Sequence, residues 1–322
     1  MKTRKLGKSG ITVSEVGYGA WAIGGSMWGG RRDDEARTSL ERAYQRGVRL
    51  VDTALVYGDG HSERLIGPFL KAHPDVAVAT KVPPKAMQWP ARPGAKLEAY
   101  FPGAWIRECC EKSLRNLAAE RIDLLQLHVW AEAWTDQDEW YGTMVKLKEE
   151  GKIRAIGISI NSHDPQSAVR VVEAGRVDAL QVFYNIFDQS PEDALFPACV
   201  EHGVGVLARV PFDEGSLTGK LTADTTFPAG DFRADYFGGG KLAETVRRVE
   251  ALRPVILGEG AAKTMARGAL RFCLSQPAVS AVIPGMRTPH QVDENCAASD
   301  DGPLAAETLA QLRAHRWVRS PY

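Results

Sequence analysis

The sequence is poor in cysteine and has neither a long apolar run nor an excess of charge. Five cysteines stand among 322 residues, and this odd, scattered set without a CxxC pair argues against a disulfide framework and a structural metal site. Lysine plus arginine equal aspartate plus glutamate at 40 each, so no net charge attracts nucleic acid or an acidic membrane surface. No stretch reaches the roughly 18 apolar residues of a membrane span, and the basic N-terminus lacks the apolar core of a secretion signal. We therefore expect a soluble protein of the reducing cytoplasm.

Short apolar runs alternate with helical patterns along most of the chain. The apolar runs predict eight strands, at 15–18, 49–52, 76–81, 122–128, 153–159, 179–183, 204–208 and 280–283. Helices are predicted at 33–45, 104–117, 137–150, 164–173, 194–202 and 261–275. Eight βα units close into a TIM barrel, whereas an open doubly wound sheet usually stops at five or six strands. We expect an α/β protein consisting of one (β/α)8 barrel domain over residues 1–322.

Three further segments lie outside this regular alternation. A hairpin around Gly7 and Gly10 is expected to plug the N-terminal end of the barrel. The connections at 83–103 and 211–240 are much longer than usual, and long ordered loops after barrel strands usually carry function. A last helix is predicted within 303–317.

Three apolar runs end in groups that hold, move or steer a proton. The first ends in Asp52 with Tyr57 just beyond it, the second in Lys81 and the third in His128. Because the carboxyl ends of parallel strands share one face of a barrel, we expect these four side chains to lie together at the catalytic face.

The four groups make chemical sense as a set. A tyrosine with its ordinary pKa near 10 donates a proton poorly at pH 7 unless a cation stabilises the phenolate, and Lys81 is the candidate cation for Tyr57. Asp52 would hold Lys81 and keep it charged, while His128 would either orient a substrate carbonyl or relay the proton. A lone Asp or Lys at a strand end is often only a cap or a rim ion pair, so the case depends on all four together.

The segments that carry these residues resemble the aldo-keto reductase superfamily. They read VDTALVYGDGHSERLIG, VAVATKV, RIDLLQLH and GKIRAIGIS, and the similarity extends over essentially the whole chain. The resemblance implies a (β/α)8 barrel with an Asp, Tyr, Lys, His tetrad. It also implies that Tyr57 is the general acid of carbonyl reduction, that Lys81 and Asp52 tune it, that His128 positions the carbonyl, and that hydride comes from C4 of a nicotinamide.

The resemblance extends to a cofactor site. It implies that Ser159 and Gln181 hold the carboxamide, although Ile160 replaces the usual Asn and Asn161 would point elsewhere in an extended chain. Arg209 stands where an aromatic ring commonly stacks on the nicotinamide, a role that a planar guanidinium can also fill. The candidate diphosphate contacts are Phe212, Ser216 and Lys220, with a solvated polar loop as the alternative.

The segment VIPGMRTPHQVDEN resembles the adenosine end of the family's site. Gly285 and Gln291 replace the Lys and Arg by which many members hold a 2′-phosphate, but Arg287 lies close enough to substitute. Glu294 and Asn295 match adenine contacts. We therefore expect NADP as cofactor, with NAD possible, and no metal.

Aromatic residues in the predicted loops suggest a substrate pocket. Trp21 and Trp28 follow the first strand, Trp89 lies in the third βα loop and Trp130 follows His128. Each is either a pocket wall, in which case Trp21 also touches the cofactor, or a packing residue. The expected partner is a small carbonyl or alcohol such as a sugar, a terpenoid or an aromatic carbonyl, and the sequence makes no prediction of an oligomeric state.

Two other functions stay open on the sequence. A lyase would use Lys81 as a Schiff base, which the neighbouring Asp52 makes less attractive because it keeps the amine protonated. A barrel that binds the nicotinamide nucleotide without turnover would act as a redox-sensing subunit.

Overall fold

Eight parallel strands form one sheet in the computed structural model, which describes residues 1–25, 30–92, 94–258 and 263–317. Each strand pairs with its neighbours in chain order, and the ring closes through bridges between Val16 and Val282 and between Gly19 and Gly285. The predicted barrel is therefore confirmed. Its strands are β3 (Tyr18–Gly19), β4 (Leu50–Asp52), β5 (Ala77–Val82), β6 (Ile122–Leu127), β7 (Ile153–Ser159), β8 (Ala179–Phe183), β9 (Gly205–Arg209) and β10 (Val279–Val282).

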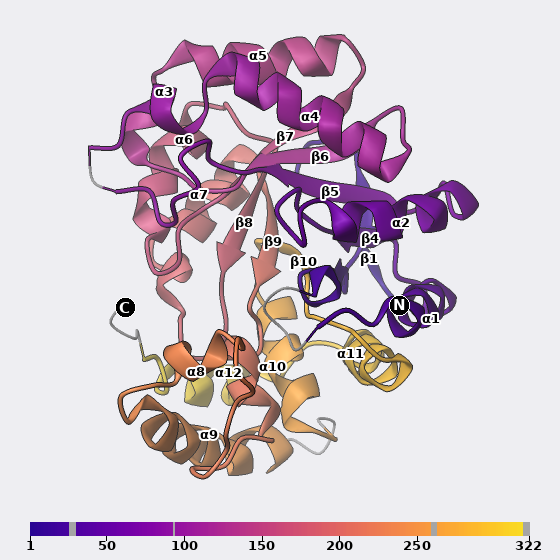
Figure 1. Cartoon of the computed structure of the whole chain (residues 1–322). Helices are drawn as coiled ribbons and strands as arrows, with labels where there is room; N and C mark the ends of the chain where they lie inside the picture. Colours follow the sequence, from indigo (N-terminus) through magenta and orange to yellow (C-terminus); the bar gives the residue numbers. More distant parts are fainter. Residues whose placement is uncertain (26–29, 93, 259–262, 318–322) are drawn as a thin grey trace.

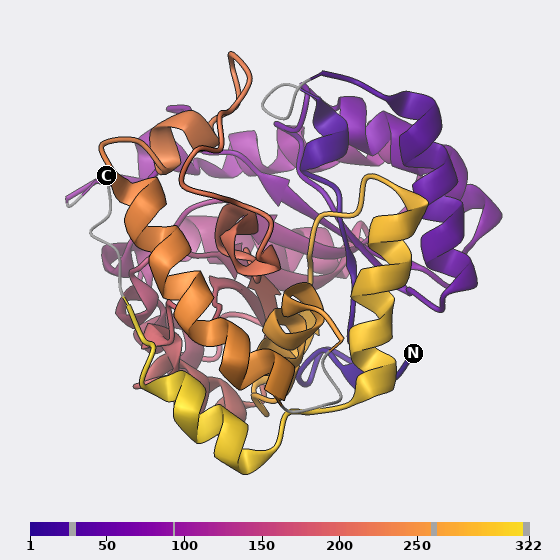
Figure 2. The same ribbon diagram turned by 90° about the horizontal axis from the view of Figure 1, so that it is seen from below.

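Helices surround the sheet, with α4 and α5 together on one side and α9 and α12 on the opposite side (Figure 1). Figure 2 shows α9 and α12 running side by side. In α4 the residues Ile106, Cys109, Cys110, Ser113 and Leu117 are buried, and this spacing gives one face to the sheet. The larger helices are α1 (Asp33–Gln45), α2 (His61–Ala72), α4 (Gly103–Leu117), α5 (Asp138–Glu149), α6 (Val169–Glu173), α7 (Leu195–His202), α9 (Lys241–Gly258), α10 (Met265–Leu274), α11 (Pro289–Asp301) and α12 (Ala306–Arg313).

The predicted hairpin is present and closes the N-terminal end of the barrel. Strands β1 (Thr3–Lys5) and β2 (Thr12–Ser14) pair antiparallel. From this hairpin Leu6, Ile11 and Val13 pack against the inward side chains of the strands. Gly7 has φ +52°, and a Cβ there would lie 2.3 Å from the backbone nitrogen of Gly205, so only glycine allows this close approach.

Alternation along the strands separates an apolar floor from a polar mouth. The inward floor contains small or aliphatic residues, among them Leu50, Ala79, Leu124, Ala155, Ala179 and Leu207. Because side chains alternate, the residue two positions later on each strand also points inward, nearer the carboxyl end. These positions hold Asp52, Lys81, Gln126, Gly157, Gln181 and Arg209.

The two long connections contain short helices. The segment after β5 includes α3 (Leu97–Tyr100), and the segment after β9 includes the 3-10 helix η5 (Asp213–Thr218) and α8 (Arg233–Tyr236). Helices α2, α9 and α11 lie in stretches where the sequence patterns predicted none. The predicted strands at 153–159 and 179–183 have the same bounds as β7 and β8, whereas the other six differ at one or both ends by one to three residues. The predicted helix at 261–275 is observed from Met265, and residues 261 and 262 are outside the described part of the chain. None of the described helices is long and apolar enough to cross a membrane.

Candidate active site

Asp52, Tyr57, Lys81 and His128 meet at the carboxyl end of the barrel. Asp52 ends β4, Lys81 lies near the end of β5, and His128 follows β6 directly. Tyr57 lies in the turn between β4 and α2, which places its phenol over the mouth. The structure thus brings together the four groups that the sequence predicted.

Lys81 is the centre of this group and is fully buried. Its ammonium donates to Asp52 Oδ1 at 2.6 Å and to the backbone carbonyl of Thr53 at 2.7 Å. Its third contact is Tyr57 Oη at 3.5 Å. Because the carboxylate of Asp52 and the carbonyl of Thr53 hold the Lys81 ammonium in place, its positive charge lies close to the Tyr57 hydroxyl.

The charges of this group favour an ammonium beside a neutral phenol. Burial by itself lowers the pKa of Lys81, but Asp52 and Tyr57 outweigh it and the pKa lies above its usual value. Burial raises the pKa of Tyr57; Lys81 opposes this rise and Asp52 adds to it. The expected effect of Lys81 on the pKa of Tyr57 is present, yet it does not outweigh the effect of burial.

His128 is a neutral imidazole in this setting. Burial, and after it the charges of Lys81 and Arg209, hold the pKa of His128 well below its usual value. Its ring lies between two aromatic side chains, 6.0 Å from the Tyr57 ring and 5.7 Å from the Trp89 ring between centroids. The buried Nδ1 has no hydrogen-bond partner among the described residues. Since a neutral imidazole carries one N–H donor, His128 can donate a hydrogen bond to a carbonyl without being charged.

Two amide side chains complete the surroundings of Asp52. Gln181 Nε2 donates to Asp52 Oδ2 at 2.7 Å, and Gln126 Nε2 approaches the same oxygen at 3.4 Å. Both amides are buried. Gln126 was missed on the sequence, although its position two residues before His128 in an apolar strand puts it on the same inward face.

The candidate carboxamide site lies on β7 and β8. The Ser159 side chain is buried at the end of β7, beside Gln181, to whose position it is directly paired. Ile160 is buried as well, and Asn161 donates to the backbone carbonyl of Trp130, away from the mouth. No described residue donates to Gln181 Oε1, so this amide oxygen and the Ser159 hydroxyl remain to bind a carboxamide.

Arg209 lies across the mouth from Tyr57. Its Nη2 donates to the carbonyl of Ile160 and to Ser162 Oγ, both at 3.1 Å. Its guanidinium carbon lies 5.4 Å from the centre of the Phe183 ring. The residue therefore extends from β9 over β8 to the end of β7.

The loop after β9 is held by a carboxylate that the sequence did not single out. Asp213 is buried, with φ +47°, and accepts from Ser216 Oγ at 2.5 Å and from Tyr236 Oη at 2.7 Å. The hydroxyl proton of Ser216 is thus donated to Asp213 and not to a diphosphate, which can only accept hydrogen bonds, so Ser216 is left with its backbone for that contact. Phe212 is half-buried against the core, and Lys220 is exposed.

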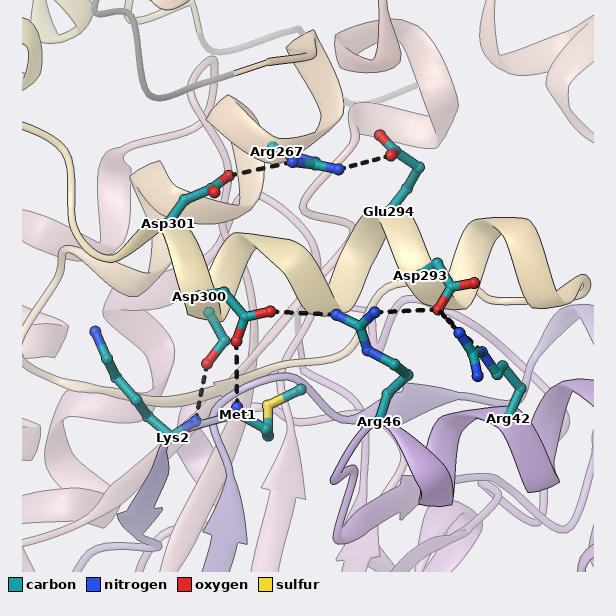
Figure 3. A network of polar contacts seen from close by, with 10 residues as sticks. Met1, Lys2, Arg42, Arg46, Arg267, Asp293, Glu294, Asp300 and Asp301 are labelled. Carbon is teal, nitrogen blue, oxygen red and sulfur yellow. Dashed lines mark hydrogen bonds and ion pairs between the residues drawn. The ribbon is translucent and has the colours of Figure 1, made fainter.

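Helix α11 carries the candidate adenosine contacts, and several are already engaged. Gln291 Oε1 accepts from the backbone amides of Arg287 and Thr288 in a capping box, so its amide serves the helix start. Glu294 pairs with Arg267 of α10 at 2.8 Å (Figure 3). Asn295 donates to the carbonyl of Gly285 at 3.3 Å.

Arg287 is half-buried in a cationic neighbourhood. Burial lowers its pKa, and the charges of Arg233 and Arg32 act in the same direction. The carboxylates of Asp231 and Glu35 act in the opposite direction and pair with Arg233 and Arg32. Guanidinium groups from three segments therefore meet here and could pair with an anion such as a phosphate. Arg233 and Arg32 were not among the predicted contacts, because their proximity depends on how the loop after β9 and the start of α1 fold back.

The four candidate tryptophans divide by position. Trp21 lies 6.4 Å from Tyr57 and 4.9 Å from Phe232 between ring centroids, and Trp89 is 42% exposed beside His128. Trp130 is fully buried and donates to the carbonyl of Ser167, packed edge-on against Trp134 and Trp140, so we remove it from the candidate pocket. Trp28 lies outside the described residues.

Two glycines at the rim of the barrel border open space. A Cβ on Gly285 would meet no described atom within 4 Å, and one on Gly215 would meet only Arg233 at 4.0 Å. Gly285 follows β10, and Gly215 lies in the loop after β9. The candidate cofactor contacts Ser159, Gln181 and Arg287 come from β7, β8 and the segment after β10. The residues present therefore fit a nicotinamide dinucleotide. The described residues contain no group of three or more His, Cys, Asp or Glu side chains that could hold a metal.

A family model described as the aldo/keto reductase family matches residues 15–316. The chain is 31% identical to the aldo-keto reductase YhdN of Bacillus subtilis over 301 residues, with 91% of this chain and 87% of that protein covered. It is 33% identical to the NADH-specific methylglyoxal reductase of Escherichia coli over 316 residues, with 92% and 93% covered.

Solved structures give the same result. The holo form of aldo-keto reductase AKR11C1 from Bacillus halodurans superposes with a TM-score of 0.77 at 29% identity, covering 98% of this chain and 96% of that one. The glycerol dehydrogenase AKR11B4 from Gluconobacter oxydans superposes with a TM-score of 0.79 at 30% identity, covering 99% and 98%. Sequence and fold therefore agree over nearly the whole chain.

Proposed function

The chain belongs to the aldo/keto reductase family, and on that premise we propose that it is an NADP(H)-dependent enzyme that interconverts a carbonyl and an alcohol with Tyr57 as its general acid. One observation carries the proposal. A buried ammonium, held by Asp52, contacts the Tyr57 hydroxyl at 3.5 Å beside a neutral histidine at the open end of the barrel.

Each residue of the tetrad has a separate task in the proposed reaction. Bound reduced nicotinamide supplies hydride to the carbonyl carbon. Tyr57 Oη donates a hydrogen bond to the carbonyl oxygen and then its proton, and Lys81 stabilises the phenolate left behind. Asp52 keeps Lys81 charged, and the neutral His128 donates a second hydrogen bond that orients the carbonyl.

The preference for NADP rests on Arg287 and its cationic neighbours. A 2′-phosphate would pair with the guanidinium groups of Arg287, Arg233 and Arg32, which lie close enough to act on one another beside the carboxylates of Asp231 and Glu35. Because one relative is named as NADH-specific, both reduced cofactors belong in the test. NADPH is expected to bind more tightly than NADH.

We also propose a reducing, cytoplasmic location. All five thiols are buried and unpaired, at Cys109, Cys110, Cys199, Cys273 and Cys296. Burial raises the pKa of Cys199 to about 12, which disfavours the thiolate that forms disulfides.

The proposal is tested with the whole protein and two tyrosine variants. Binding of NADPH and NADH is followed by fluorescence, and their oxidation is followed with a panel that includes methylglyoxal, aldoses and aromatic aldehydes. Tyr57→Phe is expected to lower kcat by at least about 100-fold while cofactor affinity changes little, because only the proton donor is lost. Tyr44→Phe on α1 keeps the partly buried ring and removes only a hydroxyl that donates to Asp75, so it is the matched control and is expected to retain activity.

Other outcomes would favour the rival functions. Failure of wild-type protein to bind either reduced cofactor contradicts the proposal. Tight binding with negligible turnover that is indifferent to Tyr57→Phe indicates a redox-sensing subunit. Trapping of a substrate on Lys81 by borohydride indicates a lyase, which requires a neutral amine where the contacts of Lys81 favour a charged one.

A further inference from the structure

Arg209 has a position that the tetrad does not explain. It ends β9 two residues after Leu207, which belongs to the apolar floor of the barrel. Alternation along the strand therefore directs Arg209 inward, on the same side as Asp52 and Lys81. A cation at this place faces the mouth and not the outer helices.

The contacts of Arg209 fix its charge above two strands. Its guanidinium donates to Ile160 and Ser162 after β7 and lies over the Phe183 ring at the end of β8. These strands also carry Ser159 and Gln181, the candidate carboxamide contacts. The charge thus lies beside the place where a nicotinamide ring would have to lie to deliver hydride next to Tyr57.

The same charge reaches the reacting groups. Arg209 lowers the pKa of both Tyr57 and His128, although burial is the larger influence on each. Tyr57 and His128 come from the opposite side of the mouth. A ring between these two residues and Arg209 would therefore experience the guanidinium charge directly.

We propose that Arg209 makes the nicotinamide site favour the reduced form of the cofactor over the oxidised form. The inference rests on the proposed function. The oxidised nicotinamide ring is a cation, whereas the reduced ring is uncharged, so a fixed guanidinium repels only the oxidised ring. Hydride donation to the substrate creates this positive charge on the ring, and Arg209 then promotes release of the oxidised product.

The ratio of two dissociation constants tests the proposal without relying on turnover. The Kd values of NADPH and NADP are measured for wild type and for Arg209→Gln, which removes the charge and keeps a donor for Ile160. The ratio of oxidised to reduced Kd is expected to fall about tenfold, a value consistent with a unit charge a few ångströms away in a partly screened site. Tenfold corresponds to a bound midpoint potential lower by about 30 mV for this two-electron couple.

Two further variants separate charge from structure. Arg209→Lys keeps the charge and is expected to restore most of the wild-type ratio even if both affinities weaken. Arg287→Gln removes an equal charge at the adenosine end and is expected to weaken both forms alike, with the ratio unchanged. Thermal unfolding of each variant shows whether it is folded.

Failure of this inference differs from failure of the proposed function. If wild type binds neither form, the cofactor assignment itself is wrong. If both forms bind and Arg209→Gln leaves the ratio within twofold of wild type, or if Arg287→Gln changes it equally, Arg209 does not discriminate between oxidation states.

Discussion

Among single residues, Gln126 offers a test of how the surroundings of Asp52 hold it, beside the shorter contacts that Asp52 makes with Lys81 and Gln181. Its amide approaches Asp52 Oδ2 at 3.4 Å, and its carbonyl oxygen lies 3.5 Å from Gln181 Nε2. Gln126→Leu is expected to lower kcat about tenfold with little change in cofactor Kd, because Asp52 and hence Lys81 lose a fixed neighbour. Steady-state kinetics measures kcat, and cofactor titration measures Kd. Gln311→Leu on the exposed face of α12 is the control; equal losses in both variants would contradict the role.

The shifted pKa values of His128 and Tyr57 predict a broad plateau in the pH dependence of carbonyl reduction. The pKa of His128 is depressed, so the ring stays neutral as pH falls through its usual value of about 6.5. The pKa of Tyr57 is raised, so the phenol stays protonated up to about pH 10 or above. Measured kcat/KM is expected to be flat between about pH 6 and 9. An acidic limb near pH 6.5 that disappears in His128→Gln would contradict this assignment.

The sequence predicts the tetrad because three members end apolar runs and Tyr57 lies just beyond one of them, but it does not predict packing between distant segments. The position of Trp130 after His128 predicts a pocket residue, but in the structure its ring packs against the rings of Trp134 and Trp140. The pairing of Glu294 with Arg267 joins two helices and leaves no local pattern. Gln126 could have been found from strand alternation alone.

At the scale of the element, β7 leaves room for the amide network because it has glycine at its inward position. A Cβ on Gly157 would lie 2.9 Å from Gln126 Cγ and 2.9 Å from Leu124 Cδ1. Gly157→Ala is therefore expected to destabilise the protein by about 1–3 kcal/mol and to lower kcat, since Gln126 must move. Gly142→Ala in α5, where a Cβ meets no described atom within 4 Å, is expected to be neutral or stabilising. Denaturant unfolding and kinetics on both variants distinguish the two effects.

Elements with a strong local period were predictable, whereas those shaped by a neighbour were not. The strands follow from their apolar runs, and the bounds of β7 and β8 are as predicted, but the ends of the other six depend on pairing and differ by one to three residues. Helix α2 contains Gly67 and Pro68, which normally argue against a helix. A Cβ on Gly67 would lie 2.7 Å from the carbonyl oxygen of Leu117, so the glycine reflects close packing on α4 and not a break.

For the whole molecule, α11 ties the first and last parts of the barrel together. Asp293 accepts from Arg42 of α1 and from Arg46, which directly follows α1, and Asp300 pairs with Arg46 and the amino group of Met1 (Figure 3). This network covers the place where β3 meets β10 through isolated bridges. It therefore reinforces the closure of the ring where the sheet itself is least continuous.

Removing this link is expected to have a modest, salt-dependent effect. Asp293→Asn leaves two arginines facing each other and is expected to lower Tm by a few degrees at low salt, since the side chains involved are partly exposed. The difference should shrink in 1 M salt. Asp34→Asn, which removes a fully exposed carboxylate on α1, is expected to leave Tm unchanged. An equal loss at both salt concentrations would indicate lost packing and not lost charge.

The hairpin that closes the N-terminal end of the barrel determines where ligands can enter. With Leu6, Ile11 and Val13 stopping one end, every ligand enters and leaves by the other. The candidate cofactor contacts Ser159 and Gln181 are buried on the strands, whereas Trp89 stands exposed at the rim. On the proposed function, the nucleotide and the small substrate would therefore both enter and leave by this open end of the barrel.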